Sequence, residues 1–447
     1  MRESTICAQP HRGTPPTPSH APHPPSHALG HALGDALGDA AITKPLLLRA
    51  GMATCSAVTT PDTISDYQDP PPFSVETDDV SLTFLPCGQD RLDALLDMIA
   101  SAQSSLDIFY YMFQDDACGT KVRDAIADAA QRGVKVRLLV DRFGTDAENS
   151  FFDPVTEAGG AFTVFSAKWS RRYFIRNHQK MTIADEQRAM VGGFNISNHY
   201  FAPPAENGWN DMGVSMTGAT IAPLLDWYEK LWDWARDDTT QFRAIRKLVK
   251  NWTPGNGRVQ LTLGGPTRAA SNWARGVKRD LAQAEKLDVV MAYFSPPRSF
   301  RRHIRRIAKR GAVRLIMAGK SDNGATIGAS RALYGGMLRK GAQIYEFQPS
   351  KLHMKLLVID DVTYFGSANF DHRSIRLNLE MMFRIDDAGL AARIREFIDG
   401  LQDASVHVTY DLHRQRSNVW TQLQWRMGWF LVSTLDYTVT RRLNAGN

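Results

Sequence analysis

The chain has 447 residues, of which 43% are apolar, which suits two domains of ordinary size or one large two-lobed body and excludes a small disulfide-stapled scaffold. A formal net charge of +6 and a pI near 9.1 indicate an anionic partner, but a charge this small does not separate nucleic acid from an acidic membrane surface. The four cysteines, Cys7, Cys55, Cys87 and Cys118, are scattered, so neither a disulfide framework nor a zinc site is suggested.

Residues 1–75 are rich in Pro, His, Ala and Gly and carry the short repeat ALGHALGDALGDA. Such a segment has too little bulky apolar matter to offset its ordering entropy, so we expect it to be disordered and of low complexity. Its histidines leave a metal-binding tract open as an alternative; they are His11, His20, His23, His27 and His31. No stretch of the chain reaches the roughly 18 to 20 apolar residues of a membrane span.

Two strand-helix-strand units follow, one beginning near residue 106 and one near residue 289. The expected strands are 106–113 and 134–140 in the first unit, and 289–294 and 313–317 in the second. The helices between them carry apolar residues at helical spacing, namely Val122, Ile126 and Ala129, and Phe300, Ile304 and Ile307. Gly133 and Gly311 lie where these helices must end, because glycine tolerates a positive φ. The chain is therefore internally repeated.

Each unit leads to a second landmark with one shared pattern. The copies are His178, Lys180, Asp185, Gly192, Gly193 and Asn195, and His353, Lys355, Asp360, Gly366, Ser367 and Asn369. Their histidines lie 353 − 178 = 175 positions apart. Because positions i and i+2 of a strand share a face, the histidine and lysine of each copy project together. A single His-x-Lys arises easily by chance, whereas two extended copies in repeated units indicate a duplicated site.

With these residues the globular part, about residues 80–405, resembles the phospholipase D superfamily, whose mark is a duplicated H-x-K-x4-D motif followed by G-[GS]-x-N. The segments YYMFQDDACG, RGVKVRLLVD, GWNDMGV and GSANFDHRSIRLNLE resemble its bacterial cardiolipin synthase branch. The resemblance implies an α/β fold of two pseudo-symmetric lobes, each a mixed β-sheet flanked by helices. The expected divisions are a disordered segment 1–75, a first lobe 76–250, a second lobe 251–405 and an amphipathic tail 406–447.

Phosphodiester chemistry has a use for the duplicated residues. One neutral imidazole attacks phosphorus to give a phosphohistidine, and a second, protonated imidazole gives a proton to the departing oxygen. By resemblance His178 is the nucleophile and His353 the general acid, and the exchanged assignment stays open. The groups expected to hold the non-bridging oxygens are Lys180, Lys355, Asn195, Asn369 and Ser367. No cofactor is then required, and a metal site is disfavoured because each ammonium would repel the cation.

The acidic residues divide by position. Asp185 and Asp360 complete the two catalytic motifs, and they lie at strand ends before turns, so we expect them to make structural hydrogen bonds. Asp211 and Glu380 lie at matching places downstream of each motif. An imidazole used in catalysis needs an acceptor on its other ring nitrogen, and these two carboxylates fit that role. A surface or turn carboxylate is an equal alternative from the residues alone, and the resemblance favours orientation.

The resemblance implies a cardiolipin synthase-like phosphatidyltransferase that joins two phosphatidylglycerol molecules and releases glycerol. Three alternatives stay open: a phospholipid hydrolase of the phospholipase D type, a nuclease of the same fold, and a non-catalytic membrane adaptor. The expected partners are anionic phospholipids and a membrane surface rather than nucleic acid. The expected location is peripheral, on the cytoplasmic face of the bacterial inner membrane.

Three segments could contact such a membrane. The helix near residues 298–310 is rich in arginine, which fits either a solvated outer face or a contact with an anionic surface. Arg171, Arg172 and Arg176 precede the first motif and could attract acidic headgroups. The tail combines Trp420, Trp425 and Trp429 with basic neighbours, which suits a helix lying among lipid headgroups; a packed or dimer helix is the alternative.

Overall fold

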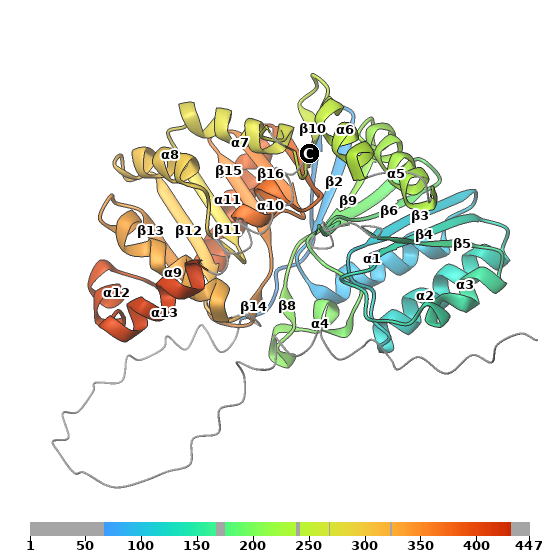
Figure 1. Ribbon diagram of the computed structural model, residues 1–447, viewed down its shortest axis with the longest axis horizontal. Helices are drawn as coiled ribbons and strands as arrows, with labels where there is room; N and C mark the ends of the chain where they lie inside the picture. Colours follow the sequence, from blue (N-terminus) through green and yellow to red (C-terminus); the bar gives the residue numbers. More distant parts are fainter. Residues whose placement is uncertain (1–66, 167–174, 238–241, 268, 322–323, 431–447) are drawn as a thin grey trace, which may run out of the picture. The chain divides into compact units, whose positions relative to one another are not determined.

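The computed structural model of the protein describes residues 67–166, 175–237, 242–267, 269–321 and 324–430 (Figure 1). Most of the low-complexity segment, Arg171, Arg172 and the end of the tail therefore lie outside the described residues. Residues 73–75 were expected to belong to the disordered segment, but they begin strand β1 (Phe73–Thr77). The reason is packing, because the ring of Phe73 stacks on that of Phe84 with centroids 5.0 Å apart.

Among the described residues, the first half of the chain forms a mixed sheet of eight strands in the order β1-β2-β9-β7-β6-β3-β4-β5. The bounds are β1 (Phe73–Thr77), β2 (Val80–Leu85), β3 (Ser105–Tyr110), β4 (Lys135–Asp141), β5 (Ala161–Phe165), β6 (Lys180–Ala184), β7 (Arg188–Gly192) and β9 (Gly213–Gly218). Strands β3, β4 and β5 run parallel, and the other pairs are antiparallel. We call this half the first lobe.

The second half forms a second sheet of eight described strands, in the order β10-β17-β16-β15-β11-β12-β13-β18. The bounds are β10 (Val259–Gly264), β11 (Leu287–Met291), β12 (Val313–Ala318), β13 (Gln343–Phe347), β15 (Lys355–Ile359), β16 (Val362–Gly366), β17 (Glu380–Asp386) and β18 (Ser405–His407). Seven neighbouring strands of this sheet, β10-β17-β16-β15-β11-β12-β13, repeat the order β2-β9-β7-β6-β3-β4-β5 of the first sheet. The predicted fold of two related α/β lobes is confirmed, and we call this half the second lobe.

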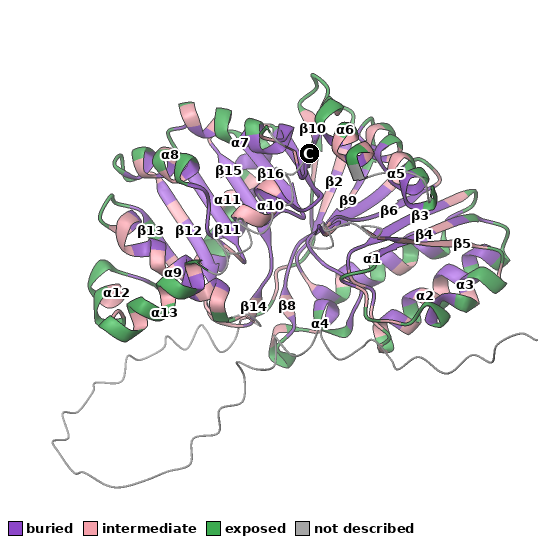
Figure 2. Cartoon of the chain, viewed as in Figure 1, coloured by how far each residue is buried: buried purple, intermediate pink, exposed green. Residues whose placement is uncertain are grey.

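Helices cover both faces of each sheet (Figures 1 and 2). The first lobe and its following segment contain α1 (Gly88–Ala100), α2 (Ala117–Gln131), α3 (Asp153–Glu157), α4 (Asn198–Phe201), α5 (Ile221–Arg236), α6 (Phe242–Asn251) and the 3-10 turns Asn149–Phe152 and Pro204–Glu206. The second contains α7 (Asn272–Gln283), α8 (Arg298–Ala308), α9 (Gly324–Leu338), α10 (His372–Arg376), α11 (Ala388–Asp403), α12 (Tyr410–Arg416) and α13 (Val419–Phe430).

Three hydrophobic cores hold these layers. One lies between the first sheet and α1 to α3, and a second between the second sheet and α7 to α9. The third is shared by both lobes and includes α5 and α11. In it Phe84 of the first sheet meets Phe365 of the second with ring centroids 5.5 Å apart. Because each fully buried apolar side chain stabilises a fold by about 1.5 to 3 kcal/mol, this shared core fixes the two lobes against each other.

The predicted strand-helix-strand units are present in both lobes. Gly133 and Gly311 follow α2 and α8 with φ angles of 90° and 75°, as expected for glycine after a helix. The first strand of each unit ends earlier than predicted, at Tyr110 in β3 and at Met291 in β11. The chain leaves the sheet there to form single bridges, from Phe113 to Ile196 and from Phe294 to Phe370.

Two short pairings join the lobes through their backbones. Strand β8 (Trp209–Asn210) pairs in parallel with β14 (Lys351–Leu352), directly before His353. Asn177, directly before His178, forms a parallel bridge with Leu379. Each motif therefore enters its strand from a residue whose backbone pairs with the opposite lobe. The predicted lobe boundary at residues 250 and 251 stays a prediction.

The motif aspartates close the turns at the far ends of β6 and β15. Asp185 has a φ of 54°, and its Oδ1 accepts the N–H groups of Ser104 at 2.7 Å and Gln103 at 2.9 Å. Asp360 has a φ of 49°, and its Oδ1 accepts the N–H of Lys286 at 2.8 Å. Although burial raises the pKa of the Asp185 carboxyl, the backbone donors lower it to about 2. Both side chains tie their strand to the start of a neighbouring segment.

Replacing Asp185 by alanine should lower the free energy of unfolding by about 1 to 3 kcal/mol, because the backbone donors lose their acceptor and a left-handed φ disfavours alanine. Asp185→Asn should retain most of the stability, since the amide oxygen still accepts and asparagine tolerates this φ. The carboxylate contributes stability above its ordinary pKa that is lost as the pH falls toward about 2. Urea denaturation of the two variants tests this, and equal losses would contradict it.

Candidate active site

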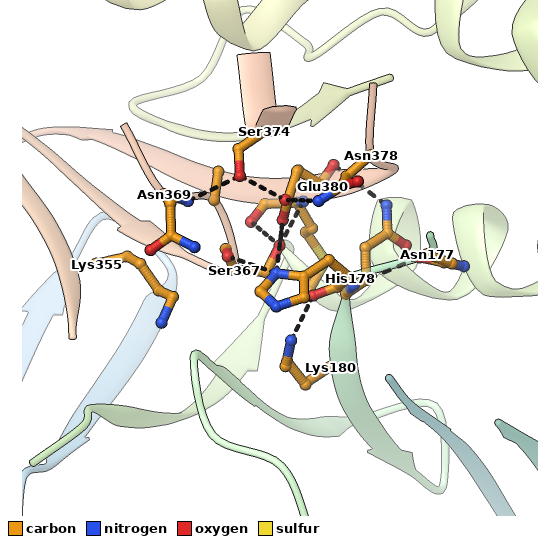
Figure 3. A network of polar contacts seen from close by, with 12 residues as sticks. Asn177, His178, Lys180, Lys355, Ser367, Asn369, Ser374, Asn378 and Glu380 are labelled. Atoms are coloured by element: carbon orange, nitrogen blue, oxygen red, sulfur yellow. Dashed lines mark hydrogen bonds and ion pairs between the residues drawn. The ribbon is translucent and has the colours of Figure 1, made fainter. Parts of the chain in front are cut away.

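The first motif places His178 at the lobe boundary, two residues before the start of β6 (Figure 3). Its backbone N–H donates to the carbonyl of Leu379 in the second lobe at 2.9 Å. Its Nδ1 lies 3.3 Å from Oε2 of Glu380, the next residue of that lobe, and 3.1 Å from the carbonyl oxygen of Ser367. The backbone contact and the side-chain contact together fix the ring so that Nε2 is left for substrate.

The second motif repeats this arrangement with the lobes exchanged. The backbone N–H of His353 donates to the carbonyl of Asn210 in the first lobe at 2.8 Å. Its Nδ1 lies 2.6 Å from Oδ2 of Asp211, the next residue of that lobe. Each imidazole is therefore oriented by a carboxylate of the opposite lobe. The sequence matched Asp211 and Glu380 to the two motifs by position, but only the docked lobes reveal this crosswise pairing.

Glu380 accepts hydrogen bonds on both oxygens (Figure 3). The Ser367 hydroxyl donates to Oε2 at 2.6 Å, and the Ser374 hydroxyl donates to Oε1 at 2.8 Å. The amide of Asn378 donates to Oε1 at 3.3 Å. Burial raises the pKa of the Glu380 carboxyl, but His178 and Ser367 outweigh it and the pKa lies below its usual range. A buried carboxylate with this many donors stays anionic and rigid.

Asp211 explains a difference between the two motif copies. A Cβ added to Gly193 would lie 2.5 Å from Oδ1 of Asp211, so the carboxylate fills the space of a side chain there. The second copy has Ser367 at the corresponding position, and its hydroxyl contacts the longer Glu380 instead. Oδ1 of Asp211 accepts the N–H of Met212 at 2.8 Å. Gly paired with Asp and Ser paired with Glu therefore fill equivalent spaces.

Arg91 holds the backbone of Asp211 in place, a role that the sequence did not reveal. The Arg91 side chain is fully buried, and its guanidinium donates to the carbonyls of Asp211 at 2.6 Å and Tyr200 at 2.7 Å. It also donates to the carbonyl of Pro86 at 2.5 Å. A planar cation with several fixed donors suits this task better than a lysine. Arg91 lies within an ordinary helix sequence, so no local pattern distinguishes it.

The two motif lysines are buried beside the imidazoles. Lys180 donates to the carbonyl of His178 at 2.6 Å, and Nζ of Lys355 lies 2.8 Å from Nδ1 of His353. Burial lowers the pKa of Lys180 to about 7 and that of His178 to about 4, and Lys180 also lowers the latter. Burial and Lys355 lower the pKa of His353 in the same way. Without an anion, both imidazoles are therefore neutral near pH 7.

Charges of the two lobes also act across the boundary. Lys355 of the second lobe contributes to the lowered pKa of His178, and Lys180 of the first lobe contributes to that of His353. Besides burial, which is the larger cause, Lys355 also lowers the pKa of Lys180, because like charges repel at short range. Figure 3 shows Lys180, Lys355 and Asn369 around the His178 imidazole. The two motifs thus contribute to one electrostatic site.

The two motif asparagines differ in their contacts. Oδ1 of Asn195 accepts the N–H of Met112 at 3.2 Å, and its amide donates to the Tyr200 hydroxyl at 2.8 Å. Asn195 therefore braces the site from behind. Oδ1 of Asn369 is buried and has no hydrogen-bond partner within the described part of the chain. The side-chain oxygen of Asn369 thus lacks the bracing contact that the side-chain oxygen of Asn195 makes.

Aromatic rings pack on both imidazoles. The ring of Tyr111 lies 4.9 Å from that of His178. The rings of Trp209 and Tyr200 lie 4.7 Å and 5.2 Å from that of His353. These rings restrict the orientation of the imidazoles and reduce the access of water to them. Trp209 belongs to the GWNDMGV segment, which the sequence analysis used only as a signature of the resemblance.

Asp141 is a second buried residue that the sequence analysis missed. Its Oδ2 accepts the N–H of Asn177 at 2.8 Å, and its Oδ1 accepts the N–H of Phe143 at 2.8 Å. Burial raises the pKa of the Asp141 carboxyl to about 7, although these donors oppose the shift. It fixes the residue before His178 against the end of β4. In sequence it is simply the last residue of a strand, which gives no signal of this task.

No helix within the described ranges is long and apolar enough to cross a membrane. Arg176 places its guanidinium 3.9 Å from the ring centroid of Phe143, beside the first motif. The expectation that arginines at this position attract acidic headgroups stays a prediction.

Comparison with known proteins agrees with this geometry. The family described as "Cardiolipin synthase, PLD-like domain" matches residues 95–232 and 277–401, which hold both motif lobes. The chain belongs to this family. The phospholipase D superfamily and its cardiolipin synthase branch, inferred from the two motif copies, are thereby confirmed.

Several curated relatives share most of the chain. It is 28% identical over 360 residues to the major cardiolipin synthase ClsA of Bacillus subtilis (strain 168), covering 78% of this chain and 74% of the relative. It is 26% identical over 321 residues to cardiolipin synthase A of Pseudomonas syringae pv. syringae, covering 70% and 66%. The crystal structure of phosphatidylserine synthase from Haemophilus influenzae Rd KW20 superposes with a TM-score of 0.66 at 15% identity, covering 85% of this chain and 98% of that one. This last likeness shows the fold.

Replacing either carboxylate by its amide should disable the site without unfolding the lobes. Glu380→Gln and Asp211→Asn each remove the anion that holds one imidazole of the opposite lobe, and we expect kcat to fall by about a hundredfold or more. Ser374→Ala removes one donor to Glu380 and should cost about tenfold or less. Steady-state kinetics with thermal melts as control tests this. Unchanged kcat in both amide variants would contradict the crosswise orientation.

Binding of a phosphodiester anion should weaken as the pH rises. Lys180 is cationic below its pKa of about 7 and loses this charge above it, whereas both imidazoles are neutral across this range. The inhibition constant of dimethyl phosphate, a monoanion throughout, should rise by about tenfold from pH 6 to 8.5. Lys180→Met should bind it weakly and with a shallower profile. A flat profile in the unaltered protein would contradict this assignment.

Proposed function

We propose that the protein is a cardiolipin synthase-like phosphatidyltransferase that joins two phosphatidylglycerol molecules and releases glycerol. The observation that carries the proposal is the crosswise site, in which His178 and His353 are each oriented by a carboxylate of the opposite lobe. Two buried lysines add positive charge at the same place. Two imidazoles with two cations suit a phosphodiester that must lose one alcohol and accept another.

In the first step, Nε2 of neutral His178 attacks the phosphorus of one phosphatidylglycerol. The bond from phosphorus to the glycerol oxygen breaks, and protonated His353 gives its Nε2 proton to that oxygen, so free glycerol leaves. The product is a phosphatidyl group bound to His178 through a P–N bond. The carboxylate of Glu380 stabilises the positive ring that forms on His178 during attack.

In the second step, the terminal hydroxyl of a second phosphatidylglycerol attacks the same phosphorus. His353, now neutral, takes the hydroxyl proton, the P–N bond breaks, and cardiolipin leaves with His178 restored. Water in place of the lipid alcohol would give phosphatidic acid, which is the hydrolase outcome. The aromatic rings around the two imidazoles favour transfer because they restrict water.

The electrostatics of the site suit this sequence of protonation. The lowered pKa keeps His178 unprotonated and nucleophilic near pH 7. Arrival of the phosphate anion raises the pKa of His353, because an opposite charge at short range favours the imidazolium that the acid role requires. Lys180 and Lys355 then neutralise the charge that grows on the non-bridging oxygens. The assignment of nucleophile and acid follows the family resemblance.

The substrates of this reaction are membrane lipids, so the enzyme works at a bilayer surface. The expected location is peripheral, on the cytoplasmic face of the bacterial inner membrane, with anionic phospholipids as partners. The net charge of +6 supports this attraction.

A substrate with a leaving group that needs no proton separates the two histidines. With bis(p-nitrophenyl) phosphate, His353→Ala should still release about one equivalent of p-nitrophenolate in a burst, because only the acid is missing. His178→Ala should give no burst, because no covalent intermediate forms. Rapid-mixing absorbance measures both. The reverse pattern would exchange the roles, and full turnover in either variant would end the two-histidine scheme.

The reaction class is tested with phosphatidylglycerol vesicles and product analysis by mass spectrometry. Release of glycerol with one cardiolipin for each glycerol supports the transferase. Phosphatidic acid in place of cardiolipin would support the hydrolase, and cleavage of single-stranded DNA without action on lipid would support the nuclease.

A further inference from the structure

The described part of the chain concentrates its exposed large apolar side chains in the last two helices. Phe143 is exposed elsewhere, and the remaining ones are Tyr410, Val419, Trp420, Leu423, Met427 and Phe430. Val419 and Trp420 keep 81% and 75% of their surface in contact with solvent. A cluster of this kind on one element marks an interaction surface, whereas scattered exposed apolar residues do not.

Helix α13 has two apolar faces with different surroundings. One face packs on the protein: a Cβ added to Gly428 would lie 2.8 Å from the carbonyl oxygen of Ala325, and Trp425 stacks on His413 with centroids 5.3 Å apart. The other face carries the five exposed apolar residues of α13, which are Val419, Trp420, Leu423, Met427 and Phe430. At 3.6 residues per turn these five fall within an arc of about 100°. Packing therefore fixes α13 with one apolar stripe turned to solvent.

A cationic hollow borders α13. A hollow of about 310 Å³ between α9, α12 and α13 is lined by Arg339, Arg414 and Arg426, which make no ion pair within the described residues. The nearby Glu346 is only 1% exposed and is already paired with Arg331. The charge of this hollow is thus strongly positive. The planar guanidinium of arginine, with its fixed fork of donors, suits phosphate groups.

A second hollow, of about 360 Å³, is lined by cationic side chains throughout. They are Arg298, Arg302, Arg305, Arg306, Lys309 and Lys340. Helix α8 supplies most of them and is joined to α13 through Arg301, whose guanidinium lies 6.0 Å from the ring centroid of Trp429. The apolar stripe and both cationic hollows therefore belong to neighbouring helices on the outer side of the second lobe (Figure 1).

We propose that α13, with the cationic hollows beside it, is the surface by which the protein docks on an anionic phospholipid bilayer. The stripe from Val419 to Phe430 enters the boundary between headgroups and acyl chains, and Arg414 and Arg426 bind lipid phosphates. This inference rests on the proposed function, because an enzyme that acts on lipids must bind a membrane. It names the surface that binds.

The charge pattern favours a bilayer over other occupants. A two-fold contact between two copies would place the same patch against itself, so that arginines would meet arginines. A nucleic acid would leave the apolar stripe without a partner, because it presents phosphates rather than hydrocarbon. An anionic bilayer satisfies both the stripe and the cations.

Sedimentation with vesicles tests the proposal in the full chain. Leu423→Glu/Met427→Glu should weaken binding to vesicles of equal parts phosphatidylglycerol and phosphatidylcholine by at least about tenfold. Gln131→Glu/Asn149→Glu is the matched control, because it adds the same charge at exposed positions of the first lobe. Arg414→Gln/Arg426→Gln should weaken binding to these vesicles more than Lys121→Gln/Lys135→Gln, and this difference should fade at high salt.

Turnover separates this inference from the proposed function. The α13 variants should release glycerol from detergent-dispersed phosphatidylglycerol at the unaltered rate, because none of these residues contacts the two imidazoles. If the unaltered protein binds vesicles through α13 but releases no glycerol, the proposed function is wrong and the docking surface is retained. Unaltered vesicle binding by the α13 variants would overturn the docking surface. If light scattering shows a dimer of the unaltered protein, loss of that dimer in the α13 variants with vesicle binding retained would also overturn it.

Discussion

The site depends on the exchange of carboxylates between the two lobes. Glu380 orients His178, and Asp211 orients His353. Neither lobe therefore supplies both a catalytic histidine and the carboxylate that orients it. The backbone repeats this exchange, because the N–H of each histidine donates to the carbonyl of the residue before its carboxylate partner. Duplication therefore explains more than the presence of two motifs: each copy completes the other.

This exchange accounts for much of the surrounding structure. The shared hydrophobic core, with contacts such as Phe84 on Phe365, keeps the lobes in the register that the exchange needs. Arg91 and Asp141 then fix the backbone on the first-lobe side of the two imidazoles. Burying these charges costs desolvation energy. The interactions of Glu380 with His178 and of Asp211 with His353 offset part of this cost. A bound phosphate would add the negative charge that the two lysines lack.

The sequence predicts the lobes, the paired motifs and the candidate orienting carboxylates, because all of these repeat along the chain. It does not predict that Glu380 serves His178 rather than His353, because spacing carries no information about how two lobes dock. It also misses Arg91 and Asp141, since one looks like a helix residue and the other like a strand end. Asn195 shows a related limit: its motif position matches Asn369, but its amide is bonded to Met112 and Tyr200.

The central claim is that both imidazoles act on one phosphorus atom. A crystal structure of the full chain with tungstate, a phosphate-like anion that diffracts strongly, tests it most directly. The account predicts a single anion with Nε2 of His178 and Nε2 of His353 on opposite sides, both within about 3.5 Å of it. Anions bound separately, or one anion touching a single imidazole with the other ring turned into a different cavity, would contradict the account.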